Sequence, residues 1–591
     1  MTPLLSDVTP SWPCCGHVSL SADTRERCLG RRVDPYRRCL AHLGDDHRAA
    51  YLAQLGPGSD LDHRGTFITE SLLALLLDAV RDPDTQQVVL GTVRFDGARF
   101  LGDVDFCGAY IKGEASFEQA TFLGTARFVA TTFAEDARFE RTLFRGAQFR
   151  EAAFDSNAWF GQAQFTDDVR FDRVRFSGHA RFGLAAFSGN AAFDGAHFIG
   201  SVGLQGAHVR GCAWFDGATF ECASRLGPLV CEEAVDLSRV IFTAPVVIEA
   251  ATMRIWCTQT EWAAKATLRL RYATVDLTDA VLAHPFSIIA QTGPFTDRTG
   301  TERTQEALEE GVLAGSDARV HVASLGGVDA AHVVLHNVDL TRCLLSGAVH
   351  LDQLRLEGGY LLAPPPAGVR RRGLLPVRWT KRRTLAEEQH WRAAQGQGAW
   401  MAAPTGVKVV EPTELASVYR QLRKSFEDGK NEPDAADFYY GEMEMRRHDR
   451  NRPRAERTLL SLYWALSGYG MRASRALGWL LGAMAATALV MTLWGIPKVV
   501  AKSESTGRLT GQSISMTSGT TDPIDPNGPF GQRINSQRFE RSLRVVINSV
   551  VFRASSQDLT TAGTYVEMLS RIVEPALLAL AVLAVRCRVK R

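Results

Sequence analysis

The sequence predicts a mainly β protein, a long solenoid of short strands, followed by an α-helical hairpin and two transmembrane helices. Three observations support this fold class. Phenylalanine recurs every five or six residues between Phe95 and Phe220, and a small residue stands two positions before each repeat centre. Two long apolar segments lie near the C-terminal end. Since 591 residues are too many for one ordinary domain, we expect several modules.

The phenylalanine repeat contains 24 centres, of which 21 are phenylalanine. Ile111, Leu204 and Val209 occupy the other three positions. Successive centres are separated by 13 steps of five residues and 10 steps of six, so the larger period is eleven. Two residues before the centres stand 17 alanines, 5 valines and 2 threonines. Because alternate residues of a strand share one side, each Ala-x-Phe unit predicts a short strand with both apolar residues facing inward.

A helix does not explain this spacing. At about 100° per residue, steps of five and six residues place successive phenylalanines about 140° and 120° apart around a helix, so no single apolar face forms. The many glycines would weaken such a helix further.

The run of Ala-x-Phe units, such as ARFVATTF and AAFDGAHF, resembles the pentapeptide-repeat proteins. The resemblance implies a right-handed, four-sided β-helix with the centre residue and the residue two before it pointing inward. The frequent sixth residue departs from the family's pattern and implies a coil of about 22 residues. The 24 centres would then form about six coils. At about 4.8 Å per coil they form a rod of about 29 Å.

Weaker repeats centred mainly on leucine continue after Phe220, so we assign residues 91–360 to one solenoid. A polar stretch at about 292–317 interrupts the pattern and predicts a loop. Some pentapeptide-repeat proteins mimic DNA and bind topoisomerases, which requires a strongly negative rod. From Gly91 to Arg225 there are 16 acidic and 14 basic residues, a net charge of −2. A DNA mimic is therefore the least favoured function that we consider.

Residues 1–90 are expected to cap the first coil, because the ends of a solenoid must be covered. A helix from Thr69 to Arg81, stopped by Pro83, has leucines suited to that task. No apolar core of a secretory signal is present in the first thirty residues. The eleven cysteines are irregularly spaced, so we expect a reducing cytoplasm rather than a disulfide framework.

The cap is rich in thiols and imidazoles, the ligands that suit tetrahedral Zn²⁺. The Cys39-x-x-His42 spacing can place two ligands on one turn. We predict a structural zinc site made of Cys15, Cys28, Cys39 and His42, with His17 as an alternate ligand. The other interpretation is a set of buried free cysteines with exposed histidines, since the spacing matches no standard zinc finger.

Residues 361–410 are expected to form a basic and flexible linker. Pro364 to Pro366 end the repeats, and seven basic residues follow between Arg370 and Arg383. Contact of these residues with acidic lipid headgroups is the alternative to a simple solvated linker.

Residues 411–450 predict a helical hairpin that resembles one tetratricopeptide-like unit, with its turn from Gly429 to Pro433. A single hairpin cannot bury its apolar face alone, so it is expected to pack on another element. Residues 451–475 predict a basic, interfacial helix leading into the membrane.

Residues 476–591 are expected to form a two-span membrane module. Ala476 to Ile496 is an uncharged stretch of 21 residues, enough for one span. The second apolar run, Ile572 to Val585, is shorter and reaches the usual length only when extended back to Tyr565, across two charged residues. An external loop at about 497–564 joins the two spans.

Basic residues set the expected orientation in the membrane. Eight arginines precede the first span, and a basic tail follows the second. By the positive-inside rule, the solenoid and the C-terminus are cytoplasmic. The resemblance to pentapeptide-repeat proteins suggests a bacterial protein and therefore the inner membrane. The arginines are Arg446, Arg447, Arg450, Arg452, Arg454, Arg457, Arg472 and Arg475, and the tail is Arg586, Arg588, Lys590 and Arg591.

The stretch RSLRVVINSVVFRASSQDLTTAGTYVEML resembles the two-span pore module of potassium channels, with an amphipathic segment and a turn before the last span. The resemblance covers about the last 115 residues. The family's filter, Thr-Val-Gly-Tyr-Gly, is absent, and Thr560-Thr561-Ala562-Gly563 retains only part of it. Filter carbonyls are therefore not assigned. A plain two-span anchor is the alternative.

No enzyme is expected, because the sequence has no Walker A, Gly-x-Gly-x-x-Gly, Gly-x-Ser-x-Gly or His-Glu-x-x-His motif. A net charge of +2 gives no global field for nucleic acid. The favoured function is a membrane-anchored, non-enzymatic scaffold that presents the β-helix to an unidentified protein partner. The alternative is a homo-oligomeric, ion-channel-like protein. Membrane lipids are expected partners in both cases, and the oligomeric state distinguishes them.

Overall fold

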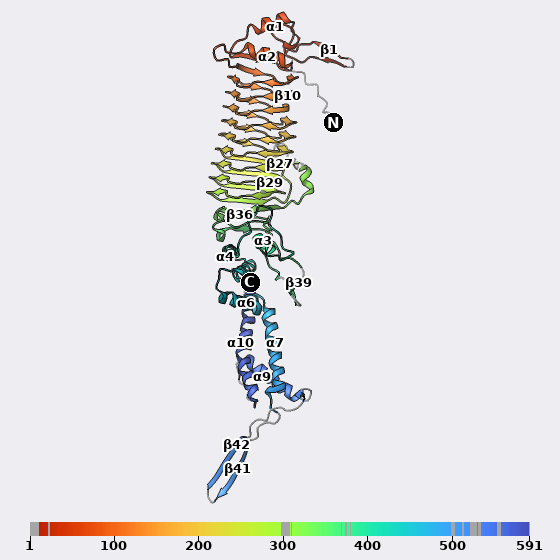
Figure 1. The fold of residues 1–591 in the computed structure, drawn as a ribbon. Helices are drawn as coiled ribbons and strands as arrows, with labels where there is room; N and C mark the ends of the chain where they lie inside the picture. Colours follow the sequence, from red (N-terminus) through yellow and green to blue (C-terminus); the bar gives the residue numbers. More distant parts are fainter. Residues whose placement is uncertain are drawn as a thin grey trace. The chain divides into compact units, whose positions relative to one another are not determined.

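The computed structural model describes residues 11–21, 24–296, 308, 310–367, 369–372, 375–378, 380–497, 503–510, 513–520, 529, 533–551, 553 and 557–589 (Figure 1). The chain divides into two compact units, Met1–Val410 and Glu411–Arg591. The first unit contains the predicted β-solenoid, and the second is mainly helical.

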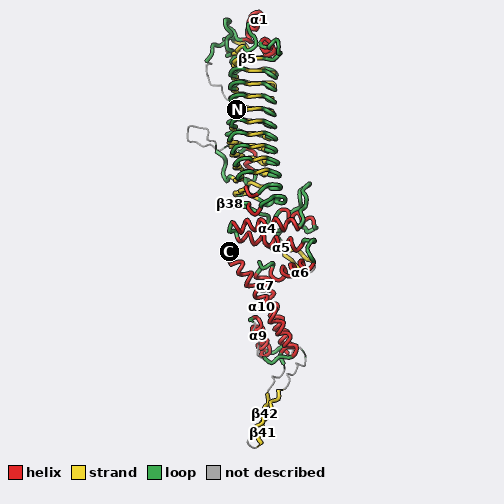
Figure 2. The backbone as a smooth tube through the Cα atoms, turned by 90° about the vertical axis from the view of Figure 1, so that its left-hand side faces the viewer, coloured by secondary structure: helices red, strands yellow, loops and turns green. Residues whose placement is uncertain are grey.

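The solenoid is one continuous sheet of 36 strands whose turns stack in parallel (Figures 1 and 2). One side carries 13 strands in register, from Leu61 paired with Val93 to Val334 paired with Arg355. Twelve intervals of about 4.8 Å give a stack of about 58 Å. These strands are β3 Ser59–Asp62, β5 Val89–Arg94, β9 Ala115–Ser116, β12 Ala137–Arg138, β15 Ala158–Trp159, β19 Ala180–Arg181, β23 Val202–Gly203, β27 Ser224–Asp236, β29 Val246–Trp256, β31 Ala266–Arg271, β34 Phe286–Ala290, β36 Val333–His336 and β38 Arg355–Glu357.

The remaining strands of the sheet form the other three sides. They are β4 Phe67–Ile68, β6 Arg99–Phe100, β7 Val104–Asp105, β8 Tyr110–Ile111, β10 Thr121–Arg127, β11 Thr132–Phe133, β13 Leu143–Gln148, β14 Ala153–Phe154, β16 Gln164–Phe165, β17 Val169–Arg170, β18 Arg175–Phe176, β20 Ala186–Phe187, β21 Ala191–Ala192, β22 His197–Phe198, β24 His208–Val209, β25 Cys212–Trp214, β26 Thr219–Phe220, β28 Ile241–Phe242, β30 Glu261–Trp262, β32 Thr274–Asp276, β33 Val281–Leu282, β35 Val320–Ser324 and β37 Val338–Asp339.

The interior follows the predicted pattern. All 24 centres are at most 6% exposed, and the small residues two positions before them are at most 4% exposed. The phenylalanines stack from turn to turn, as in Phe100 on Phe122 with ring centroids 4.5 Å apart and Phe122 on Phe144 at 4.9 Å. Thr131 fits the apolar interior because its hydroxyl donates to the Phe106 carbonyl oxygen at 2.7 Å.

The coil length changes along the solenoid. Paired residues are 21 or 22 positions apart from Val93 to Val246, as the six-residue steps predicted, and 20 apart from Val246 to Phe286. Turns of the longer type place a residue in the left-handed region two positions after every second centre, including Gly97 and Gln119. Between Phe286 and Val333 the register jumps by 47 residues. The insertion contains a 3₁₀ turn at Gly311–Gly315, and residues 297–307 and 309 lie outside the described part.

The solenoid begins earlier than the predicted residue 91. Strand β3 already pairs with β5, and Leu61, His63 and Ile68 fill the interior of the first turn. The repeat pattern missed this turn because it contains no inward phenylalanine. Helix α1, Asp45–Leu52, precedes this turn. Helix α2, Glu70–Ala79, follows its strands and buries Leu72, Leu73, Leu76 and Leu77.

The predicted flexible linker at 361–410 is not wholly a linker. It contains helix α3, Ala386–Ala394, most of whose residues are buried. The Glu387 carboxylate accepts hydrogen bonds from the backbone of Leu345 and Ser346, so this helix caps the last turns. The charged composition of this segment predicted that it would be exposed to solvent. Glu388 is instead buried, and its charge is paired with Arg392 at 2.7 Å. Strands β39, Val369–Arg372, and β40, Leu375–Arg378, form a separate ribbon.

The second unit contains the predicted helical hairpin and two long apolar helices. The hairpin is α4, Pro412–Asp428, and α5, Glu432–His448, and α6, Arg454–Ser467, packs on it. Helix α7, Ala473–Val490, continues as a π-helical stretch, η5, Met491–Gly495. Helix α10 is Thr561–Val589. Ala473–Gly495 and Thr561–Arg586, with mean hydropathy of 1.8 and 1.9, are long and apolar enough to cross a membrane.

The predicted external loop at 497–564 is also partly structured. It contains the ribbon of β41, Ser503–Thr510, and β42, Ser513–Thr520. Helix α9, Ser536–Val550, packs against both α7 and α10 and buries Ser542, Val545, Val546 and Ser549. This helix is the amphipathic segment noted in the sequence, and its buried face combines two valines with two serines.

Candidate metal centre

The N-terminal cap holds Cys15 and Cys28 at the base of a hairpin. Strands β1, Val18–Ser21, and β2, Thr24–Arg27, pair antiparallel. At their base the Cys15 amide donates to the Gly30 carbonyl at 2.7 Å, and the Cys28 amide donates to the His17 carbonyl at 2.8 Å. The two cysteines thereby flank the same end of the ribbon.

Cys39 and His42 lie on one tight turn, as their spacing predicted. Cys39 precedes the 3₁₀ helix η1, Leu40–His42, and the His42 amide donates to the Cys39 carbonyl oxygen at 2.9 Å. The Cys39 Sγ and His42 Nδ1 atoms are 3.2 Å apart. The turn thus presents a thiol and an imidazole nitrogen together.

The four predicted ligands converge. The ligand atoms of Cys15, Cys28, Cys39 and His42 all lie within 4.8 Å of one another. Cys28 Sγ is 3.8 Å from Cys39 Sγ, and Cys15 Sγ is 3.6 Å from His42 Nδ1. Around tetrahedral zinc, bonds of about 2.3 Å to sulfur and 2.0 Å to nitrogen place two sulfurs about 3.8 Å apart and sulfur and nitrogen about 3.5 Å apart. The cluster could therefore hold a metal ion such as zinc.

The cluster favours at least one thiolate. The hydrogen bond from Cys39 is the main cause that lowers the Cys28 pKa to about 5, and the Gly30 amide, 3.4 Å from Cys28 Sγ, lowers it further. The same interaction raises the pKa of Cys39, the donor, and burial raises it further. One proton shared by two sulfurs leaves a charge that a divalent cation would neutralise.

His17, the predicted alternate ligand, is not among the four converging residues. Its ring lies against the His42 ring, with centroids 4.2 Å apart, and its Nδ1 is 2.8 Å from Arg38 Nη1. Cys14 also lies outside the cluster, and its Sγ is 3.4 Å from the Trp12 carbonyl oxygen.

Gly30 is a site residue that sequence reasoning missed. A Cβ at this position would lie 2.9 Å from Cys39 Cβ and 3.0 Å from its Sγ, so any side chain would displace that ligand. The available signal was a glycine two residues after a predicted ligand, where an amide can donate to the sulfur.

The cap is joined to the first solenoid turn by charge. Asp62 on β3 pairs with Arg31 at 3.2 Å and with Arg64 at 2.8 Å. The Arg64 guanidinium also lies over the Trp12 ring, 5.1 Å from its centroid. Since Arg31 follows Gly30 in the chain, a metal ion in the cluster would fix the segment that docks on the solenoid.

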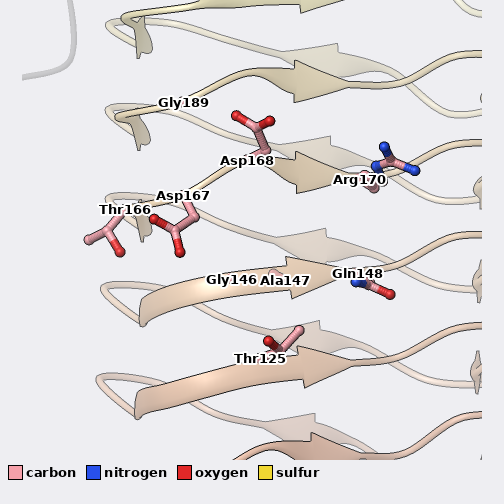
Figure 3. Close-up of a pocket in the computed structure, with 9 residues that line it drawn as sticks. All are labelled: Thr125, Gly146, Ala147, Gln148, Thr166, Asp167, Asp168, Arg170 and Gly189. Carbon is pink, nitrogen blue, oxygen red and sulfur yellow. The ribbon is translucent and has the colours of Figure 1, made fainter.

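A shallow polar depression on the solenoid is a second candidate site (Figure 3). It is lined on stacked turns by Thr125, Gln148 and Arg170, with Asp167 and Asp168 at a corner. Asp168 Oδ1 already accepts from the backbone and side-chain nitrogens of Asn190, at 2.7 and 3.2 Å. This carboxylate holds one turn to the next, so the depression offers little unused chemistry.

The comparisons with known proteins agree with the fold. A family model described as pentapeptide repeats (9 copies) matches residues 139–186 and 184–227. The solenoid is therefore a pentapeptide-repeat β-solenoid. No curated protein and no solved structure matches the chain. The family match lies within the solenoid and does not bear on the C-terminal helices.

Proposed function

We propose that the protein is a membrane-anchored, non-enzymatic scaffold whose cytoplasmic β-solenoid presents a rigid surface to a protein partner. The observation that carries this proposal is the exposure of the two long apolar helices. Only 33% of each apolar window is buried. Leu481 on α7 is 64% exposed and Ile572 on α10 is 69% exposed. In water these side chains would form a large apolar surface, whereas the hydrocarbon of a bilayer accommodates them.

The basic residues before the first span support a cytoplasmic solenoid, although some of them pair with carboxylates of the protein. Arg447 pairs with Glu444 at 2.7 Å and Arg452 pairs with Glu456 at 2.5 Å, so their charges are largely compensated. Arg450 and Arg454 are exposed and available to anionic headgroups. Lys590 and Arg591 of the basic tail lie outside the described residues.

Membrane fractionation of the full chain tests the anchor. We expect the protein to resist alkaline carbonate extraction, and protease added to sealed cells from outside to leave the solenoid intact. Release by carbonate would refute the anchor, and cleavage of the solenoid from outside would refute the orientation.

A homo-oligomeric, channel-like protein is the second candidate. It is favoured because α9 packs against both α7 and α10, and because the start of α10 is joined to the end of α7. The Thr560 hydroxyl donates to the Trp494 carbonyl oxygen at 2.7 Å, which joins the start of α10 to the end of α7. Gly563 allows that approach, because a Cβ there would lie 2.4 Å from the Gly495 carbonyl oxygen.

Light scattering of the detergent-solubilised chain separates the two functions. A tetramer with ion flux in liposomes would support the channel-like protein. A monomer would support the scaffold, because a pore of this type needs several copies. The nearly neutral solenoid gives no support to a DNA mimic, which a topoisomerase-binding assay would test.

We also propose that the cap binds structural zinc through Cys15, Cys28, Cys39 and His42. Elemental analysis of the full chain should find about one zinc per molecule. Cys39→Ser should lose that zinc and loosen the cap, as measured by hydrogen exchange of the β1–β2 hairpin. Cys14→Ser is the matched control, because Cys14 is adjacent but outside the cluster, and it should keep the metal. Equal zinc content in wild type and Cys39→Ser would refute the site.

A further inference from the structure

A carboxyl group is buried where three helices of the second unit meet. Glu574 on α10 is 0% exposed. The Thr487 hydroxyl on α7 donates to its Oε1 atom at 2.8 Å, and the Ser549 hydroxyl on α9 contacts its Oε2 atom. One side chain thus joins α7, α9 and α10.

In the part of the chain that the structure describes, Glu574 has no charged partner. Among the described residues its hydrogen-bonding partners are the two hydroxyls, and no salt bridge to it is present. The titratable residue on α7 is Arg475 in its first turn, which donates to the Trp464 carbonyl oxygen at 2.7 Å, and Ala476 to Ile496 contains none. An ionised carboxylate with only two hydroxyl donors, away from water, carries a large desolvation penalty.

In the described part of the chain, the charged residues on the helices around Glu574 form no ion pair with it. On α9, Glu540 pairs with Arg544 at 2.6 Å. Arg538 donates to backbone carbonyl oxygens at the end of the first span, and Arg541 and Arg553 make no contact with Glu574. On α10 the nearest titratable groups are Glu567 and Arg571 on the preceding turns, and Arg586 on a later one. None of them forms an ion pair with Glu574 in the described structure.

The single proton of the Ser549 hydroxyl indicates whether the Glu574 carboxyl is protonated. Ser549 Oγ lies 2.7 Å from the Val546 carbonyl oxygen and also contacts Glu574 Oε2. A hydroxyl has one proton and cannot donate to both oxygens. If Ser549 donates to Val546, its oxygen is free to accept, and Glu574 must be the donor. A neutral carboxylic acid satisfies every contact, since Oε1 still accepts from Thr487.

We propose that Thr487, Ser549 and Glu574 form a proton-binding site in which the Glu574 carboxyl is a neutral acid. The proton lies between Glu574 Oε2 and Ser549 Oγ. Removing it leaves a charge in an apolar setting, and the single Ser549 proton can then serve either Glu574 or the Val546 carbonyl oxygen, so one hydrogen bond of the site on α9 is lost. The site therefore couples the docking of α9 to the protonation of α10. Only the membrane setting of this site rests on the proposed function.

Infrared spectroscopy of the full chain in detergent tests the proton directly. At neutral pH the difference between wild type and Glu574→Gln should contain a carboxylic acid C=O band that shifts in heavy water. Glu540→Gln, which removes an exposed, ion-paired carboxylate on α9, should remove a carboxylate band instead. Loss of only a carboxylate band in Glu574→Gln would overturn the proposal.

Hydrogen exchange measures the effect on α9. In wild type, exchange of the C-terminal half of α9 should rise roughly tenfold when alkaline pH removes the proton, after correction for the intrinsic rate. Glu574→Gln, which cannot ionise, should remove that rise while keeping α9 protected. A pH dependence unchanged by Glu574→Gln would overturn the coupling.

These readouts separate the inference from the membrane proposal. An acid band in a chain that carbonate extracts would leave the proton site standing and refute the anchor. A carbonate-resistant chain without the band would refute the proton site alone.

Discussion

The interior of the solenoid and the junction of α7, α9 and α10 are built by opposite rules. Inside the solenoid, 24 centres repeat one solution, in which an apolar side chain points inward and stacks on the next turn. At the helical junction the buried side chains include Thr487, Ser542, Ser549 and Glu574, while several leucines on the same helices, such as Leu481, are exposed. This is the difference expected if water surrounds the solenoid and, as proposed above, hydrocarbon surrounds the helices. Four substitutions test this comparison.

The largest expected effect is in the phenylalanine stack. Phe149 is fully buried and stacks on Phe128 and Phe171 with centroids 5.0 and 4.9 Å apart. Phe149→Ala should lower the free energy of unfolding by about 3–5 kcal/mol, because it leaves a cavity in a close-packed interior. Chemical denaturation of the full chain in detergent measures this loss. Leu123→Ala, at a residue 48% exposed on the same solenoid, is the control and should change little.

The next effect contrasts two exposed leucines. Leu481→Arg on α7 should disfavour membrane insertion by about 2.5–3.5 kcal/mol, since an arginine at the centre of a span must enter hydrocarbon. Leu123→Arg makes the same change on the solenoid and should leave insertion unchanged. The carbonate-resistant fraction of each variant measures the difference. Equal fractions for both variants would mean that the two surfaces face the same solvent.

A pH effect is expected from the first solenoid turn. Burial lowers the pKa of His63 to about 4, from an ordinary value of about 6.5. Between these values the unfolded chain binds a proton that the folded chain excludes, so stability falls as pH is lowered. The loss should reach about 3 kcal/mol at pH 4.

Thermal unfolding of the full chain at several pH values measures the His63 effect. His63→Leu should flatten the dependence between pH 6.5 and 4. The exposed His179 provides the matched control, and His179→Leu should retain the dependence. If both variants behave as wild type, the interior does not exclude this charge.

The smallest effect concerns a polar group inside the solenoid. Thr131→Val keeps the shape of the side chain but removes its hydrogen bond to the Phe106 carbonyl oxygen. That oxygen keeps the Ala109 amide as a partner, at 3.1 Å, so the expected loss is only about 1 kcal/mol. Thr132→Val, at the adjacent and less buried position, should be neutral in the same denaturation experiment.

Residues with a local signature were predictable. The five- and six-residue steps determined the strands and their inward residues, and the Cys39-x-x-His42 spacing indicated one turn with two ligands. Cys15 and Cys28 were predicted by residue type, but their approach to Cys39 depends on the hairpin between them and on Gly30. The first turn was missed because Leu61 and His63 do not extend the phenylalanine pattern.

The sequence by itself determined the repeat, its inward residues and two apolar helices, because each depends on the spacing of neighbours along the chain. Only the tertiary structure showed that α3 covers the last turns, that α9 packs between α7 and α10, and that Thr487, Ser549 and Glu574 meet. Those features depend on contacts between residues up to 87 positions apart, in the case of Thr487 and Glu574. Such contacts leave no periodic trace in the sequence, since hydrogen bonds rather than repeated burial hold them together.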